Sequence, residues 1–133
     1  MKKIILLFIA IVGIIACGKS DDSSNNDGKA SSSYAPPSWM IGTWVNELTN
    51  TTGYFVSDKD FCLISAGRTC LLSGTTAQVV TKISQKITND TYEVSIEMNN
   101  GSQSIDFSFK KISDNKIAKL DLKGGVTDTF TKQ

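Results

Sequence analysis

The chain has 133 residues, and 14 basic residues nearly balance 13 acidic ones, so the composition indicates no basic face for nucleic acid. The sequence contains no histidine, which excludes histidine-based acid–base catalysis, Ser-His and Cys-His nucleophile pairs, and histidine metal sites. The length predicts one domain.

The first sixteen residues are typical of a secretory signal. Lys2 and Lys3 precede an almost wholly apolar run from Ile4 to Ala16. This run has 13 residues, fewer than the ~20 that a helix needs to cross a bilayer core but within the ~7–15 of a signal peptide. We therefore expect residues 1–16 to be removed as a signal peptide.

The end of this run indicates lipidation. Ile14, Ile15 and Ala16 directly precede Cys17, and this order resembles the lipobox of bacterial lipoproteins. The resemblance implies cleavage after Ala16, a diacylglycerol on the Cys17 sulfur, and usually an acylated amine. Two or three acyl chains, palmitate among them, would hold the protein at a membrane without a transmembrane helix. The alternative is an ordinary secretory signal with an incidental cysteine.

The residues after Cys17 indicate where the anchored protein lies. No aspartate directly follows the cysteine, which favours the outer membrane over retention in the inner membrane. The stretch from Lys19 to Asp22 resembles the short acidic export signals of some surface lipoproteins, so surface exposure is expected rather than a periplasm-facing domain; the alternative is that Asp21 and Asp22 are solvated linker.

A tether separates the anchor from the domain. Residues 17–37 are dominated by Ser, Asn, Asp, Gly and Lys, so they cannot bury enough apolar surface to offset the entropy of ordering. A flexible coil of this length has an end-to-end distance of roughly 25 Å. Pro36 and Pro37 mark its end, and we expect the domain to span residues 38–133.

The domain is expected to be all-β. β-Branched and aromatic residues rise after Trp39, and turn signals recur every 8–12 residues, which favours a small antiparallel meander barrel of about eight strands or, alternatively, a β-sandwich. Residues 77–87 also fit a helical face, so a short helix before a strand is the alternative there. The nine candidate strands are residues 42–48, 53–57, 60–65, 69–72, 77–87, 91–98, 103–112, 116–122 and 126–132.

One hairpin has a predictable register. Asn100 and Gly101 form the strongest two-residue turn signal, because a type I′ turn needs positive φ at both positions. Pairing outward from this turn places every large apolar residue of one strand opposite another: Tyr92 with Phe109, Val94 with Phe107, and Ile96 with Ile105.

The next connection extends the sheet. With Asp114 and Asn115 at the tip, Phe109 is expected to face Leu120, and Phe107 to face Leu122. The last connection, around residues 124–125, is open: a three-residue loop would place Phe130 opposite Leu120, whereas a two-residue loop would not.

The start of the domain resembles a known family. Gly42, Thr43 and Trp44 resemble the Gly-x-Trp motif on the first strand of lipocalins and related small barrels. The resemblance implies that Trp44 closes the base of a barrel and that Lys132 covers it, where lipocalins use arginine. It also implies a small hydrophobic ligand in a cavity bordered by Trp44, Phe107 and Phe109. The alternatives are that both tryptophans are core anchors of an ordinary β-sandwich and that aromatic side chains fill the interior.

Two further cysteines predict a disulfide. Cys62 and Cys70 lie eight residues apart around a plausible turn at residues 66–68, and an even pair in an exported domain favours a disulfide over free thiols or a redox function. Closing this loop should contribute roughly 2–3 kcal/mol on the chain-entropy model. No metal site is expected, and residues 58–60 are interpreted as a turn rather than a cation loop.

These observations predict a binding protein rather than an enzyme, with no cofactor. The first hypothesis is a membrane-anchored lipoprotein that binds a small hydrophobic ligand. The second is a surface interaction or structural lipoprotein with a solid core, which recognises protein or glycan through its loops. Membrane lipid attached through Cys17 is the one partner that the sequence itself indicates.

Overall fold

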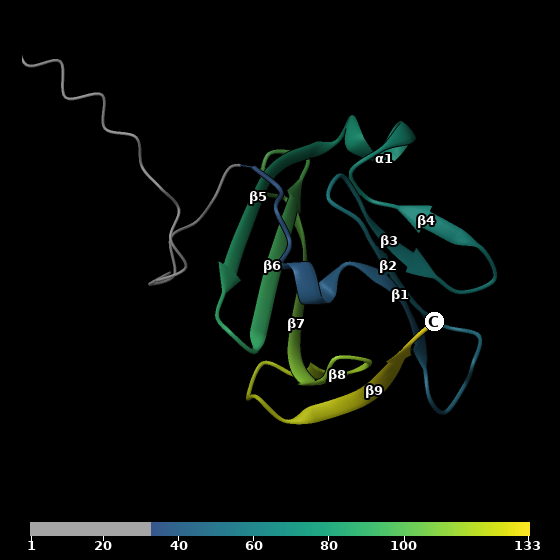
Figure 1. The fold of residues 1–133 in the computed structure, drawn as a ribbon. Coiled ribbons are helices and arrows are strands. Elements are labelled where there is room, and N and C mark those ends of the chain that lie inside the picture. Colours follow the sequence, from purple (N-terminus) through teal and green to yellow (C-terminus); the bar gives the residue numbers. More distant parts are fainter. Residues whose placement is uncertain (1–32) are drawn as a thin grey trace, which may run out of the picture.

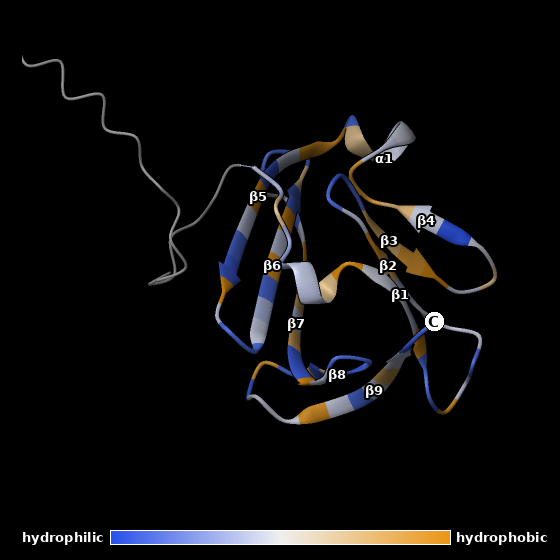
Figure 2. Ribbon diagram, viewed as in Figure 1, coloured by the Kyte–Doolittle hydropathy of each residue, from blue (hydrophilic) through white to orange (hydrophobic). Residues whose placement is uncertain are grey.

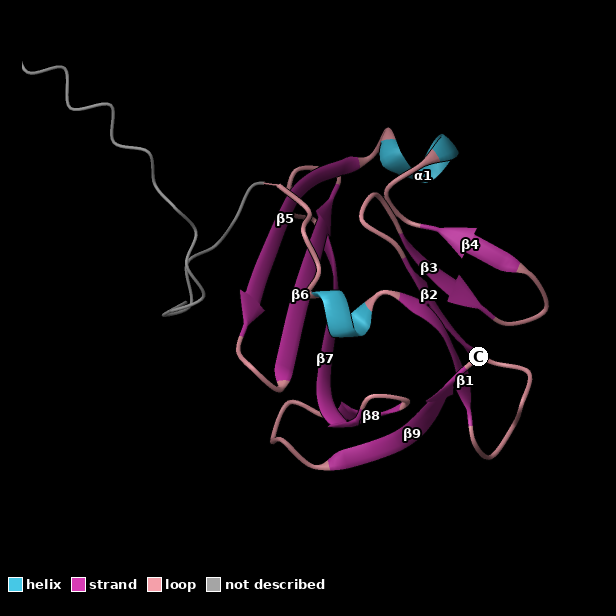
Figure 3. Ribbon diagram, in the orientation of Figure 1, coloured by secondary structure: helices cyan, strands magenta, loops and turns pink. Residues whose placement is uncertain are grey.

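The computed structural model describes residues 33–133; the expected signal peptide, Cys17 and most of the tether lie outside the described residues. Nine antiparallel strands form one sheet in the order β4-β3-β2-β1-β9-β8-β7-β6-β5, and the sheet curls into a half-barrel (Figure 1). Strands make up nearly all of its regular structure (Figure 3). The elements are η1 (Ser38–Met40), β1 (Gly42–Asn46), β2 (Gly53–Val56), β3 (Phe61–Ile64), β4 (Arg68–Cys70), α1 (Gly74–Ala77), β5 (Val80–Ile87), β6 (Thr91–Met98), β7 (Gln103–Ser113), β8 (Lys116–Leu120) and β9 (Val126–Lys132).

The expected all-β meander is confirmed. Strands that are consecutive in sequence pair with each other, except β4 and β5, which form the two free ends of the sheet; in addition, β1 pairs with β9. The ambiguous segment 77–87 is mainly strand β5, and the one-turn helix α1 comes just before it. Among the described residues, no helix has the length and apolar character needed to cross a membrane.

The β6–β7 hairpin has the predicted register. Tyr92 faces Phe109, Val94 faces Phe107, and Ile96 faces Ile105. The backbone φ angles of Asn100 and Gly101 are +57° and +84°, as the turn chemistry requires. Hydrophobic and hydrophilic residues alternate along β6 (Figure 2), because one face of this strand is buried and the other is wet.

The predicted pairing of β7 with β8 is wrong by one residue. Ser113 faces Lys116 across the expected tip, but one extra residue on β7, Ile112, bulges out between the paired residues Lys111 and Ser113. Phe109 therefore faces Lys119 instead of Leu120.

The pairing of β8 with β7 is also shorter than expected. The β7–β8 pairing ends at Phe109, so Phe107 has no partner in β8, and Leu122 is fully exposed at 101%. On the far side of β8, Phe130 of β9 faces Ile117 and not Leu120. Ile112 is 53% exposed and lies out of phase with the alternating residues Phe107 and Phe109.

An N-terminal strap, defined as residues Ser33–Met40, crosses the open side of the half-barrel between β5 and β3 (Figure 1). The side chain of Gln85, on the inner face of β5, donates to the Ser33 carbonyl (2.8 Å) and accepts from the Ala35 amide (3.3 Å). The Tyr34 hydroxyl donates to the Asp60 carbonyl, just before β3 (3.0 Å). Residues Ser33–Ala35, which precede the boundary expected at Ser38, thus contact the sheet as well.

Gln85 is buried, yet its amide is hydrogen-bonded on both sides. Its oxygen accepts a second hydrogen bond, from the Tyr92 hydroxyl (2.9 Å). Burial is the main cause that raises the pKa of Tyr92 and of Tyr34 well above the ordinary tyrosine value, so both hydroxyls are neutral donors. Because both its oxygen and its nitrogen have hydrogen-bond partners, this buried amide holds the strap without leaving either atom unsatisfied.

The concave face of the sheet and the strap enclose one hydrophobic core. The strap contributes Met40, which is completely buried, and the segment after β4 contributes Leu71. The other members come from the inner faces of the strands: Trp44, Tyr54, Val56, Phe61, Tyr92, Val94, Ile96, Met98, Phe107, Phe109, Ile117 and Phe130.

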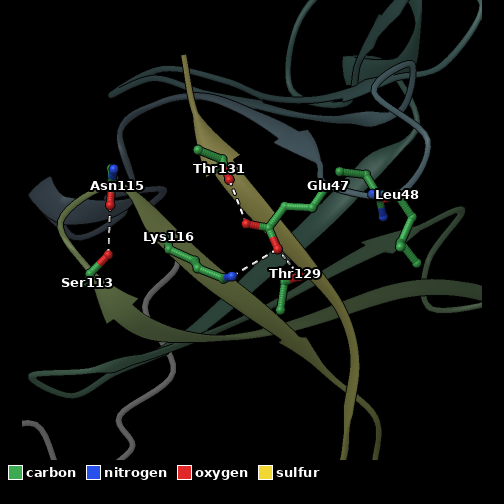
Figure 4. A network of polar contacts seen from close by, with 8 residues as sticks. Glu47, Leu48, Ser113, Asn115, Lys116, Thr129 and Thr131 are labelled. Carbon is green, nitrogen blue, oxygen red and sulfur yellow. Dashed lines mark hydrogen bonds and ion pairs between the residues drawn. The ribbon is translucent and has the colours of Figure 1, made fainter.

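A polar network on the outer face ties three strands together (Figure 4). The Glu47 carboxylate, just after β1, accepts from the hydroxyls of Thr129 and Thr131 on β9 and pairs with Lys116 of β8 at 2.9 Å. These contacts, the Thr129 hydrogen bond foremost, lower the pKa of Glu47 to about 2 from an ordinary 4.5. The network links β8 to β9, and the connection between these two strands forms one wall of the candidate site.

The burial pattern predicts that substitution by alanine lowers the free energy of unfolding much more at one leucine than at another. Leu71→Ala should lower the free energy of unfolding by about 2–5 kcal/mol, because the side chain is only 3% exposed and its loss leaves a cavity. The matched control Leu122→Ala should change it by about 0.5 kcal/mol or less, since that side chain is 101% exposed. Urea titration of both variants checks this; equal losses would contradict the assigned core.

The Glu47 network predicts a pH dependence. Because its pKa is lowered on folding, the carboxylate stabilises the fold above about pH 4.5, and that contribution disappears as pH falls toward 2. Glu47→Gln should therefore be less stable than the wild type near neutral pH, and the difference should shrink between pH 4.5 and 2. Urea titration across this range measures it. Glu93→Gln, at an exposed carboxylate without an ion pair among the described residues, is the control and should show no such convergence.

Candidate functional site

The residues to which the lipocalin resemblance gives a role in closing a barrel, Gly42, Trp44 and Lys132, lie together at the β1–β9 junction. Trp44 is completely buried, and the Lys132 ammonium lies 5.2 Å from the centre of the Trp44 ring. Gly42, at φ +139°, leaves the space for this lysine, because a Cβ at that position would lie 2.5 Å from Lys132 Cε. The indole nitrogen donates to the Met40 carbonyl of the strap (2.8 Å).

Of the residues expected to line a ligand cavity, Phe107 and Phe109 pack against other aromatic rings of the interior. The Tyr54 ring lies between three phenylalanines, with centroids 5.0 Å from Phe109, 5.1 Å from Phe130 and 5.7 Å from Phe107. Phe61 stacks on Phe107 at 4.8 Å. These rings fill the middle of the interior with edge-to-face and stacked contacts.

The predicted disulfide is confirmed. Cys62 of β3 directly faces Cys70 of β4, and their sulfur atoms are bonded to each other. Asp60 lies close to both sulfurs, and its carboxylate accepts from the Leu72 amide at 3.0 Å. Since both sulfurs are used in the disulfide, this group offers no thiolate for a metal ion. The bridge fixes the short edge strand β4 at one end of the sheet.

A concavity among the described residues lies on the outside of the sheet. We call it the outer groove; its volume is about 440 Å³. Gln85, Val94 and Phe107 are buried toward the interior, so their neighbours along β5, β6 and β7 point outward. These outward side chains form the floor: Ser84, Lys86, Glu93, Ser95, Asp106 and Ser108.

The β8–β9 connection forms the wall of the outer groove. Leu120, Asp121, Leu122 and Gly124 line it. The Asp121 carboxylate accepts from the backbone amides of Lys123 and Gly125, both at 2.8 Å, and so holds this loop in shape. The loop stands away from the sheet because β8 leaves β7 at Phe109, as described above.

The floor of the groove is rich in hydroxyls and carboxylates. The Ser104 hydroxyl donates to Asp106 at 3.1 Å and is within 3.1 Å of the Ser95 hydroxyl. Lys86 and Glu93 face each other across β5 and β6, but they form no ion pair in the described part of the chain. The lining thus combines three carboxylates and one ammonium with apolar surface, including that of Leu120 and Leu122.

The alternation that places Val94 and Phe107 on the inner face puts Glu93, Ser95, Asp106 and Ser108 on the outer face, but it gives no reason to regard that face as a site. The missing information is where β8 stops pairing with β7, since the wall lies beyond that point. Comparison with family models, with curated proteins and with solved structures finds no match, so the geometry of the described residues carries the functional argument.

Proposed function

We propose that this chain is a membrane-anchored lipoprotein whose β-domain has a solid core and recognises a partner at its surface, through the outer groove. The observation that carries this proposal is the contrast between the two faces of the sheet. The inner face is filled by aromatic rings, whereas the outer face has a groove of about 440 Å³.

The proposed anchor rests on the N-terminal sequence. Lys2, Lys3 and a short apolar run precede the lipobox-like residues 14–17, which supports removal of residues 1–16 and acylation of Cys17. The lack of aspartate directly after Cys17 and the acidic pair at residues 21–22 support an outer-membrane protein that faces the exterior.

Binding is favoured over catalysis for chemical reasons. The sequence offers no histidine, and the carboxylates of the outer groove are exposed. Asp106 and Asp121 already accept hydrogen bonds from neighbouring groups of the fold, so they act as structural and recognition groups.

A second candidate, a carrier of a small hydrophobic ligand, is supported by the strap. Ser33–Met40 covers the open side of the half-barrel, and displacement of this segment would uncover Tyr92 and the rings beneath it. The juxtaposition of Gly42, Trp44 and Lys132 also fits the lipocalin resemblance.

The anchor is tested by Cys17→Ser. We expect the wild-type chain to sediment with membranes and the variant to appear in the soluble fraction, because the attachment sulfur is lost. Ser20→Ala, three residues further on, is the control and should stay with the membranes. If Cys17→Ser still sediments with membranes, the lipoprotein assignment is wrong.

The binding site is tested by placing a photo-crosslinking amino acid at Ser95 on the groove floor in intact cells. We expect defined crosslinked products from this position and none from the same group at Thr75 of α1, an exposed residue outside the groove. Mass spectrometry of the purified Cys17→Ser variant, which lacks its own acyl chains, distinguishes the second candidate. A stoichiometric co-purified lipid would favour the carrier over surface recognition.

A further inference from the structure

We propose that the outer groove binds an extended peptide segment that carries basic side chains, and that the peptide backbone pairs with the open edge of β7. This inference rests on the proposed function of the groove and names the chemistry of its partner. Three features of the described residues support it: an unpaired length of strand, a surplus of carboxylates, and an exposed apolar wall.

The first feature is the edge of β7. Gln103–Ser108 pair with β6 on one side, but β8 pairs with β7 only from Phe109 onward. On the β8 side, this six-residue length therefore has no strand partner among the described residues. A strand edge presents a row of backbone donors and acceptors, which an extended peptide satisfies by adding a strand. Asp106–Ser108 lie both on this edge and in the outer groove.

The second feature is charge. The groove lining carries the carboxylates of Glu93, Asp106 and Asp121, against the single ammonium of Lys86. Neither Glu93 nor Lys86 forms an ion pair within the described part of the chain. A strand added at the β7 edge would place alternate side chains on the outer face, where these carboxylates lie. Lysine or arginine at those positions gives the complementary charge.

The third feature is the wall formed by the β8–β9 connection. Leu122 is fully exposed, and Leu120 is only partly buried, so aliphatic surface lies beside the carboxylates. The long aliphatic stems of lysine and arginine pack on such surface while their charged ends reach carboxylates. A small polyamine would satisfy the carboxylates but leave the backbone edge of β7 unused, which distinguishes it from a peptide.

The test is fluorescence anisotropy with the full chain in detergent. The probe is a labelled nine-residue peptide that alternates lysine and valine. Its comparisons are the same peptide with glutamate in place of lysine, and the lysine peptide N-methylated at alternate backbone positions. We expect the lysine peptide to bind more weakly as salt rises, the glutamate peptide to bind at least about tenfold more weakly, and N-methylation to abolish binding.

Two variants localise the binding. Glu93→Gln with Asp106→Asn should weaken binding of the lysine peptide by about tenfold or more, because two groove carboxylates are neutralised. The matched control, Glu97→Gln with Asp114→Asn, removes the same charge from residues outside the groove lining and should bind like the wild type. Circular dichroism confirms that both double variants are folded.

Several results would overturn the inference. These are equal binding of the glutamate peptide, undiminished binding of the N-methylated peptide, complete displacement by an equal concentration of spermidine, or the same affinity in the groove variant and its control. If the lysine peptide does not bind but crosslinked products still form at Ser95, this inference is wrong and the groove remains a recognition site. If both fail, the proposed function is also wrong.

Discussion

The structure depends on a constraint of sheet closure. Nine strands curl into a half-barrel, but β4 and β5 do not pair, so the concave face needs a cover that the sheet does not supply. The strap supplies it. Gln85 makes this possible, because its buried amide pairs with the backbone of the strap on one side and with Tyr92 on the other. The aromatic core, including Trp44 beneath Met40, is then enclosed by sheet and strap together.

The outer surface is shaped by the point at which β8 stops pairing with β7. Ile112 bulges from β7, and the β7–β8 pairing then runs only as far as Phe109. Gln103–Ser108 therefore have no strand neighbour on the β8 side among the described residues, and the β8–β9 connection forms the wall of the outer groove. The inner and outer faces of the sheet thus have different roles: the inner face is packed, and the outer face is open to a partner.

How well a structural feature could be predicted depends on how far apart in sequence its interacting residues lie. The β6–β7 hairpin was predictable because the turn at Asn100 and Gly101 and the alternation of apolar residues choose the same register. The Cys62–Cys70 bridge was predictable because a short hairpin places the two residues opposite each other. Both features are local in sequence.

The features that the sequence did not reveal depend on contacts between distant segments. Gln85 has no unusual neighbours in sequence. Its role depends on the fold, which places its side-chain nitrogen 2.8 Å from the carbonyl oxygen of Ser33. Similarly, the predicted pairing of Phe107 with Leu122 failed because β8 stops pairing with β7 at Phe109, while it pairs with β9 as far as Leu120. The candidate site combines both kinds of information. Its floor follows from alternation, whereas its wall follows from the end of the β7–β8 pairing.

The position of the strap also governs how the domain responds to tension. Any pull that enters from upstream of the described residues reaches the strap before it reaches β1. It then acts on the hydrogen bonds of Gln85 and Tyr34 together with the packing of the buried Met40. The strap therefore bears the load before the nine paired strands do.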